Sequence, residues 1–402
     1  MDPWWLRRGE RRAITMNATN SCLPIQQAYP DIVDALCIHV LFGFLYSLVG
    51  VAAFLGNLTV IYIVGVKKAA FTVRTVFILN LACSDLVLSL TSLPITSVTI
   101  FKREWIFPHF MCHIGGPIQG GCIFISSFTL SAIAVDRFFL IVHPTRTVIT
   151  YHLATAICVC IWVLGYIATS PSAVLSTLYH YPEVCGVFCE EKWPGNGAGR
   201  KIYGLVVFLV QFGVPLALCC YCYWAISDTL KKQMEKRIKE QVVLPANEKR
   251  MLNRRKATNR MMVLMVASFV VAWLPFNAVN MIRDLNIYDY ILPHAFFVLA
   301  FAIGHLTAMT SAICNPIIYC WYNKEFREAA IKWLFPEFVQ KQLRKYSARE
   351  NSRLQETAPL TSNSYSMVAV PRSPKSEVAA PLLSASPSRT DDPQVDSADL
   401  DG

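Results

Sequence analysis

The sequence has few charged residues: 16% of its 402 residues are Asp, Glu, Lys or Arg, and 54% are hydrophobic. Because about a quarter of the residues of a soluble domain are charged, this composition excludes an ordinary soluble globular protein. Residues 1–20 also lack an apolar core, so no cleavable signal peptide is predicted, and the first long apolar segment is expected to direct insertion. Met16 is an alternative start that would remove four arginines, Arg7, Arg8, Arg11 and Arg12.

Seven apolar segments are long enough to cross a bilayer. They span residues 36–66, 72–101, 110–142, 152–176, 202–226, 259–283 and 291–321. This pattern predicts an all-α membrane protein, with a seven-transmembrane helix bundle at 36–322 after an amino-terminal tail at 1–35. Residues 323–335 have an apolar face opposite Lys and Arg, which predicts an amphipathic helix on the membrane surface. Residues 336–402, rich in Ser, Pro, Ala and Asp without periodicity, are predicted to be a disordered cytoplasmic tail.

Basic residues in the loops predict the orientation of the chain. The segment 227–262, interpreted as a loop, carries eleven Lys or Arg residues against four acidic ones. The loops of the opposite side are nearly balanced in charge. The amino terminus is therefore expected outside the cell, with the membrane lipid around the bundle and the carboxyl tail in the cytoplasm. Asn17 begins the sequon Asn17-Ala18-Thr19 on the outer side and is the expected glycosylation site.

Polar residues that are costly in a membrane recur at fixed depths. Asp136-Arg137-Phe138 ends the third segment, Asn315-Pro316-Ile317-Ile318-Tyr319 ends the seventh, and Asp85 lies within the second. Because charge and proline are unfavourable inside a membrane helix, these residues indicate a switch more readily than packing. Helix periodicity places Cys112, Gln119, Ser126 and Arg137 on one face, with Cys112 and Arg137 about 37 Å apart, one bilayer thickness.

These motifs resemble those of rhodopsin-like (class A) G-protein-coupled receptors. Asn57, Trp162, Pro215, Tyr223 and Trp273-Leu274-Pro275 complete the set, each on its own segment and in order, and the resemblance covers roughly residues 36–335. It implies an activation switch formed by Asp136, Arg137, Tyr223, Phe269, Trp273, Pro275, Asn315, Pro316 and Tyr319. The alternative interpretation of Asp136 and Arg137 is an ion pair that only anchors a helix end.

The resemblance implies a multi-pass plasma-membrane receptor that is not an enzyme. Such a receptor promotes nucleotide exchange on a heterotrimeric G protein, and the resemblance points to the inhibitory class. Arrestin and receptor kinases are expected partners of the cytoplasmic tail, whose alternative interpretation is a tolerated linker. No feature of the sequence predicts binding to nucleic acid.

Asp85 is the most deeply placed charge of the sequence. An ionised carboxylate in apolar surroundings needs a partner or a cation. The resemblance implies an allosteric sodium ion, and no other cofactor, at a site formed by Asp85, Ser126, Ser311 and Asn315. Ala312 stands where many relatives carry a further hydroxyl, which weakens the expected site. The alternative is a protonated Asp85 that is hydrogen-bonded to Asn57 and Asn315.

The resemblance also implies a disulfide between Cys112 and the loop after the fourth segment. Cys189 is the preferred partner, because Cys189-Glu190-Glu191-Lys192-Trp193-Pro194 is similar to that loop in peptide receptors. Cys185 is the alternative partner. If Cys189 is used, Cys22 and Cys185 are left to pair with each other.

The predicted ligand pocket lacks the groups that two other ligand classes need. An amine receptor needs a carboxylate where Gln119 stands, and an opsin needs a lysine that the seventh segment lacks. The remaining polar set resembles that of neuropeptide Y and neuropeptide F receptors: Thr96, Gln119, Asn280, Asp284 and His305. The resemblance implies an amidated neuropeptide, including the invertebrate FMRFamide-like type.

Peptide chemistry is compatible with this set of residues. Neutral donors and acceptors suit a terminal amide, and the Asp284 carboxylate suits an arginine guanidinium. Asp284 is alternatively a solvated helix end, and His305 a core histidine. Other functions remain open: a tachykinin or allatostatin type of peptide receptor, and, from another class, a membrane transporter. Against the transporter, the sequence lacks an inverted repeat, a discontinuous helix pair and His/Glu metal spacing.

Overall fold

The computed structural model describes residues 22–65, 72–144, 149–182, 184–195, 197–239, 246–285 and 294–334, with isolated positions at 287, 337, 341, 344 and 345. Residues 1–343 form one compact unit, to which the following description applies. Seven helical spans of the described residues are long and apolar enough to cross a membrane, which confirms the predicted bundle. Asn17 and nearly all of the predicted tail lie outside the described residues.

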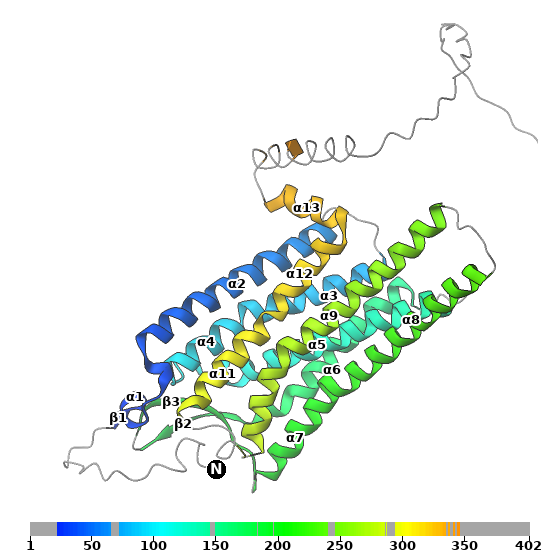
Figure 1. Ribbon diagram of the computed structural model, residues 1–402. Helices are drawn as coiled ribbons and strands as arrows, with labels where there is room; N and C mark the ends of the chain where they lie inside the picture. Colours follow the sequence, from blue (N-terminus) through cyan, green and yellow to red (C-terminus); the bar gives the residue numbers. More distant parts are fainter. Residues whose placement is uncertain are drawn as a thin grey trace, which may run out of the picture. The chain divides into compact units, whose positions relative to one another are not determined.

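The seven spans lie side by side in one bundle (Figure 1). They are α2 (Leu36–Gly65), α3 and α4 (Val73–Leu90, Ser92–Lys102), α5 (His109–Val142), α6 (Tyr151–Leu175), α7, η2 and α8 (Ala198–Phe208, Leu209–Gly213, Val214–Lys239), α9 (Ala246–Asp284), and α11 and α12 (His294–Met309, Ser311–Tyr322). A further helix, α13 (Lys324–Leu334), lies at one end of this bundle, and short strands lie at the other. We call the end of the bundle with α13 the α13 end, and the end with the strands, two of which form a hairpin, the hairpin end.

Three of the described spans are not continuous α-helices, and prolines explain the interruptions of the second and the fifth. A proline has no N–H to donate and crowds the carbonyl four residues before it. The second span is interrupted at Thr91, three residues before Pro94. The fifth contains the π-helical turn η2 at Leu209–Gly213, which ends two residues before Pro215. Such local bulges let a helix continue past a proline within the membrane.

Asn57 completes the hydrogen bonding around another proline. Pro316 cannot donate to the carbonyl of Ala312, and the Asn57 Nδ2 donates to that oxygen instead, at 2.9 Å. The helices α2 and α12 approach closely here, since a Cβ on Gly56 would lie 3.1 Å from the Pro316 ring. Lipid offers no hydrogen-bond donor, so this side chain is required inside the bundle.

The predicted amphipathic helix is present as α13. Phe326 and Ala330 are buried beneath it, and Trp333 stacks on Tyr62 of α2 with ring centroids 5.2 Å apart. Its exposed face carries charge, including Lys324 3.8 Å from Glu328. This distribution is the one expected for a helix at a membrane surface.

The prediction of a loop at 227–262 was wrong for most of its length. Helix α8 continues to Lys239, and α9 already begins at Ala246. The extension of α8 is exposed and carries an i,i+4 ion pair, Lys232 to Asp228, at 2.8 Å. Hydropathy marks only the part of a helix that crosses the apolar layer, so it could not reveal these polar extensions.

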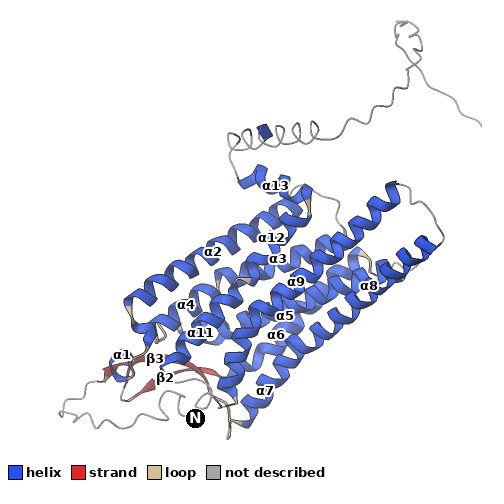
Figure 2. Ribbon diagram, viewed as in Figure 1, coloured by secondary structure: helices blue, strands red, loops and turns tan. Residues whose placement is uncertain are grey.

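A small sheet at the hairpin end was missed by the all-α prediction (Figure 2). Strands β2 (Ser176–Tyr181) and β3 (Val184–Glu191) pair antiparallel, and β1 (Leu23–Pro24) pairs parallel with the other edge of β3. The short elements α1 (Ile25–Ala28) and η1 (Ile32–Asp34) follow β1. The strands are short, so hydrophobic periodicity gives little signal over their few residues.

Residues 22–35 are attached to the bundle, although the sequence predicted only a tail there. The Arg103 Nη1 donates to the carbonyl of Tyr29 at 2.7 Å and lies 3.0 Å from the Asp34 carboxylate. Ile25 packs in a small apolar cluster with Val184 and Phe188 of β3. The sheet therefore has its own core above the spans.

Candidate functional site

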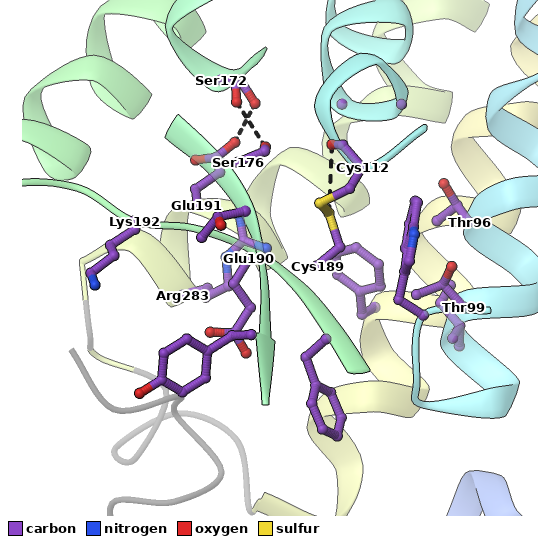
Figure 3. Close-up of a pocket in the computed structure, with 18 of the residues that line it drawn as sticks. Thr96, Thr99, Cys112, Ser172, Ser176, Cys189, Glu190, Glu191, Lys192 and Arg283 are labelled. Atoms are coloured by element: carbon purple, nitrogen blue, oxygen red, sulfur yellow. Dashed lines mark hydrogen bonds between the residues drawn. A yellow bond between two sulfur atoms is a disulfide. The ribbon is translucent and has the colours of Figure 1, made fainter. Parts of the chain in front are cut away.

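A cavity of about 710 Å³ lies at the hairpin end. It is lined by residues of α4, α5, α7, α9 and α11, and by both strands of the hairpin. Figure 3 shows Glu190, Glu191 and Lys192 on one side and Thr96 and Thr99 on the other. The volume lies in the range of ordinary ligand sites.

Two disulfides fix β3 beside this cavity. Cys112 at the start of α5 is bonded to Cys189, the bridge expected from the resemblance (Figure 3). Cys22 is bonded to Cys185, so the remaining pair is also formed. The first bridge joins the strand to the bundle, and the second joins it to the amino-terminal segment. The wall of the cavity is therefore covalently held at two points of one strand.

Thr96 and Gln119 meet inside the cavity, as their predicted role requires. The Thr96 hydroxyl donates to the Gln119 Oε1 at 3.5 Å, and both residues line the cavity. Among the described residues, the Gln119 amide nitrogen makes no hydrogen bond. A partly buried amide without a protein partner favours a ligand acceptor at this position.

Asp284 also lines the cavity, but its carboxylate is already paired. Its Oδ1 lies 3.0 Å from the Arg200 Nε and 3.2 Å from the Arg283 Nε, and its side chain is only 14% exposed. A Cβ on Gly204 would lie 2.8 Å from the Asp284 Oδ2, so the glycine leaves room for this carboxylate. Asp284 is thus part of a charge cluster between α7 and α9, and a ligand arginine would have to replace Arg200.

Asn280 and His305 do not belong to the cavity lining. The Asn280 Nδ2 donates to the carbonyl of Phe276 at 3.0 Å. His305 is fully buried, with its Nδ1 3.1 Å from the Tyr46 hydroxyl and its ring 5.5 Å from that of Phe276. This arrangement matches a packed core histidine, the alternative interpretation from the sequence.

Deeper in the bundle, Asp85 lies in a polar cluster. The carboxylate is 2% exposed and accepts from the Asn315 Nδ2 at 2.9 Å, and Ser126, whose hydroxyl is 3.3 Å from that of Ser84, lies beside it. Ser311 instead accepts from the Trp273 Nε1 at 3.0 Å. The structure therefore brings Ser126 and Asn315 to Asp85, while Ser311 connects this region to Trp273.

The donor set of this cluster fits a small hard cation. Carboxylate and hydroxyl oxygens are ligands that such ions prefer. Asn57 is committed elsewhere through its Nδ2, and its Oδ1 is buried without a hydrogen-bond partner among the described residues. The alternative interpretation is a protonated Asp85 that is hydrogen-bonded to both Asn57 and Asn315. Of these two contacts, the structure contains the one with Asn315.

Aromatic rings surround the proline of α9. Phe269 lies between Phe212 of η2 and Trp273, with ring centroids 5.7 and 6.2 Å apart. Trp273 in turn contacts Phe276 on the other side of Pro275, at 6.0 Å. Since Pro275 weakens the helix hydrogen bonding here, these rings are placed to move with a bend of α9.

The remaining switch residues lie toward the α13 end. The Arg137 Nη2 is 2.6 Å from the Asp136 Oδ2, and both side chains are largely buried. Tyr223 and Tyr319 are buried as well, and within the described part of the chain the Tyr319 hydroxyl has no hydrogen-bond partner. A buried hydroxyl without a partner is costly, so this end is suited to rearrangement.

Sequence reasoning missed the cavity wall supplied by the strands and the amino-terminal segment. Ile25, Tyr179, Tyr181 and Glu190 all line the cavity. Their positions depend on the hairpin, which the sequence did not predict. Only the fragment that begins at Cys189 gave a signal, through its likeness to the loop of peptide receptors.

The structure is a bundle of seven helices that are long and apolar enough to cross a membrane, with a cavity at one end. Residues 56–319 match the family described as 7 transmembrane receptor (rhodopsin family). The chain belongs to this family and is a G-protein-coupled receptor. It is therefore a multi-pass plasma-membrane protein and not an enzyme.

Individual relatives carry names of neuropeptide receptors. The chain is 41% identical to Neuropeptide receptor 3 of Caenorhabditis elegans over 341 residues, covering 83% of the chain and 89% of the relative. Neuropeptide receptor npr-1 of the same organism is 32% identical over 355 residues, 78% of this chain and 77% of that one. Neuropeptide F receptor of Drosophila melanogaster is 32% identical over 311 residues, 74% of this chain and 62% of that one.

The two disulfides make different predictions. Cys112→Ser or Cys189→Ser should remove most surface receptor, because that bridge fixes the hairpin to the bundle. Cys22→Ser and Cys185→Ser should each cause the same smaller loss, because that bridge tethers only the amino-terminal segment. A native disulfide contributes about 2–4 kcal/mol. Flow cytometry of an epitope-tagged receptor provides the measurement. The Cys22→Ser/Cys185→Ser double variant should match its single variants, and an additive loss would contradict the pairing.

Proposed function

We propose that this chain is a receptor for an amidated neuropeptide that signals through heterotrimeric G proteins. The observation that carries the proposal is the pair Thr96 and Gln119 in the cavity, where the amide nitrogen of Gln119 has no protein partner among the described residues. A carboxamide is matched by neutral donors and acceptors, whereas a free carboxylate would demand a cation. The names of the relatives support the same class of ligand.

We place the hairpin end outside the cell and the α13 end in the cytoplasm. Both disulfides lie at the hairpin end, and disulfides persist in oxidising compartments. The opposite ends of α8 and α9 carry the basic residues of 227–262, as expected for cytoplasmic segments. The peptide then reaches the cavity directly from the extracellular medium.

Asp284 is the proposed partner of the peptide's arginine. In the structure this carboxylate is held by Arg200, which comes from a different helix and is itself partly exposed. An arginine side chain of the ligand can take over the same hydrogen bonds in the same geometry. Binding would therefore exchange one guanidinium for another and release α7 from α9.

The signal would pass along the buried polar and aromatic contacts. Trp273 contacts Ser311, and Asn315 of the same helix contacts Asp85. A change in α9 at Pro275 can therefore shift α12, which carries Tyr319 in its last turn. We propose that Arg137 and the extensions of α8 and α9 then bind the G protein, of the inhibitory class, and that receptor kinases and arrestin act at the tail.

The peptide class is tested with matched ligands. A heptapeptide amide that ends in Leu-Arg-Phe-amide should drive nucleotide exchange on a purified inhibitory G protein. The free-acid form of this peptide should be at least about ten-fold weaker. In it, the neutral terminal carboxamide that hydrogen-bonds Gln119 is replaced by a carboxylate without a cationic partner. Gln119→Ala should reduce this preference, and equal potency of both forms on the wild type would contradict the proposal.

Arg137→Ala is the control for signalling. It should leave the affinity for the amide near that of the wild type while nucleotide exchange is lost, because Arg137 lies near the α13 end, far from the cavity. Loss of binding together with exchange would instead indicate that the substitution disturbs the fold.

The exchange of guanidinium groups at Asp284 predicts opposite effects of two substitutions. Asp284→Ala should weaken the arginine-containing peptide about ten- to a hundred-fold. Arg200→Ala should strengthen it by up to about five-fold, the value of a partly exposed ion pair, because it removes the internal competitor. Competition binding measures both. A peptide with Ala in place of Arg should bind wild type and Asp284→Ala almost equally, whereas additive losses would assign Asp284 a purely structural role.

We further propose that sodium is an allosteric ligand at Asp85. Asp85→Asn keeps the shape of the side chain but removes the charge that attracts the ion, so agonist affinity should no longer depend on sodium concentration. The test compares agonist affinity in sodium and in N-methylglucamine chloride at equal ionic strength. The variant should still reach the surface, and persistent sodium dependence in it would place the ion elsewhere.

A further inference from the structure

Glu190 lies on β3, and residues of both faces of this strand line the cavity. In the hairpin register Glu190 is opposite Thr177, and Phe188 is opposite Tyr179. Residues opposite each other, and those two further along a strand, share one face of a sheet. Thr177, Tyr179, Phe188 and Glu190 all line the cavity. The sheet therefore presents an acidic group next to aromatic rings on one surface.

The Glu190 carboxylate is only half satisfied by the protein. The Tyr181 hydroxyl donates to its Oε2 at 2.8 Å, while its Oε1 has no hydrogen bond within the described residues. No cation of the described residues lies within ion-pair distance of it. Burial raises the pKa of Glu190, opposed by the Tyr181 hydrogen bond and the charge of Arg200. A partly desolvated carboxylate that forms no ion pair with the described residues is a favourable position for a ligand cation.

Neighbouring carboxylates of the cavity differ in this respect. Asp284 contacts two guanidinium groups. Glu191 accepts from the Ser172 hydroxyl and, at 2.9 Å, from the Trp193 Nε1. Both oxygens of Glu191 therefore serve the packing of the hairpin, whereas Glu190 keeps one oxygen for a ligand.

Aromatic rings complete the surroundings of Glu190. The rings of Tyr179 and Tyr181 have centroids 4.6 Å apart, and Tyr179 is 42% exposed. A cation over a tyrosine ring gains further attraction, and a guanidinium or ammonium held by a carboxylate can contact such a ring at the same time. Carboxylate, hydroxyl and ring together form a site for a positive organic group.

We propose that Glu190, with Tyr179 and Tyr181, is a second cation site that binds a positive group of the peptide upstream of its amidated end. This inference rests on the proposed function and adds a requirement to it: the ligand carries a further positive charge beyond the arginine assigned to Asp284. That charge is either the α-ammonium group or an upstream Lys or Arg. The site selects among amidated peptides by charge at this position.

The test is a double-mutant cycle between Glu190 and the ligand charge. The probe is the heptapeptide amide Lys-Ala-Gly-Pro-Leu-Arg-Phe-amide, compared with analogues in which the amino terminus is acetylated, the Lys is norleucine, or both. Glu190→Gln should weaken the parent about ten-fold, the effect of one charge-assisted contact. The doubly neutral analogue should bind wild type and Glu190→Gln equally. The single analogues tell which of the two cations is bound.

Glu104→Gln is the matched control. Glu104 lines the same cavity, and its Oε2 would lie 2.8 Å from a Cβ on Gly186 of the same strand. The substitution Glu104→Gln therefore removes one negative charge from the lining of the same cavity. It leaves Glu190, Tyr179 and Tyr181 unchanged. The cycle with Glu104→Gln should show less than about two-fold coupling. Equal coupling in both variants, or none with Glu190→Gln, would overturn the proposal.

A second measurement does not require a peptide agonist. Carbodiimide coupling of glycinamide to Glu190, followed by mass spectrometry of the full receptor in nanodiscs, should be slowed at least three-fold by N-acetylargininamide and not by N-acetylcitrullinamide. Protection by both compounds or by neither would count against the site. An amide and a free acid that bind alike would refute the proposed function, whereas lost coupling with the amide preference intact would refute only this cation site.

Discussion

The structure depends on one constraint: lipid supplies no hydrogen bonds, so polar groups inside the bundle must satisfy one another. Asn57 donates to the carbonyl that Pro316 leaves free. Asn80 plays a comparable part between three spans, accepting from Trp162 and donating to Thr129, each at 2.8 Å. Each such contact fixes the relative depth of two helices, because an unpaired group in the apolar layer would cost more than the contact gains.

The same constraint makes the bundle suited to a two-state response. Hydrogen bonds reach α12 from α9 and from α3. Trp273 of α9 donates to Ser311, and Asp85 of α3 accepts from Asn315. A shift of α9 cannot be absorbed gradually, since a stretched hydrogen bond in an apolar interior must be replaced by another. Ligand binding at the hairpin end and rearrangement at the α13 end are therefore linked through α9 and α12.

Much of the bundle was predictable because its signal is local. Long apolar segments must be membrane helices, and costly residues such as Asp85 and Arg137 remain in them only for a reason. The resemblance to neuropeptide Y and neuropeptide F receptors placed Thr96 and Gln119 in a ligand pocket, and both line the cavity. The partner of Asp284 did not follow, because Arg200 is distant in the sequence and its helix begins earlier than hydropathy indicated.

The sequence by itself determined the number of spans, the depth of the charged and proline residues, and the family. The spans and the depths depend on periodicity or on an apolar run within one segment, and the family follows from the resemblance of the motifs. Only the tertiary structure decided that β1, β2 and β3 form a sheet, that His305 lies in the core, and that Glu190 lines the cavity with a carboxylate oxygen to which no described residue donates. These features depend on which residues of separate segments meet, and short strands and side-chain partners across helices leave no periodic signal in the chain.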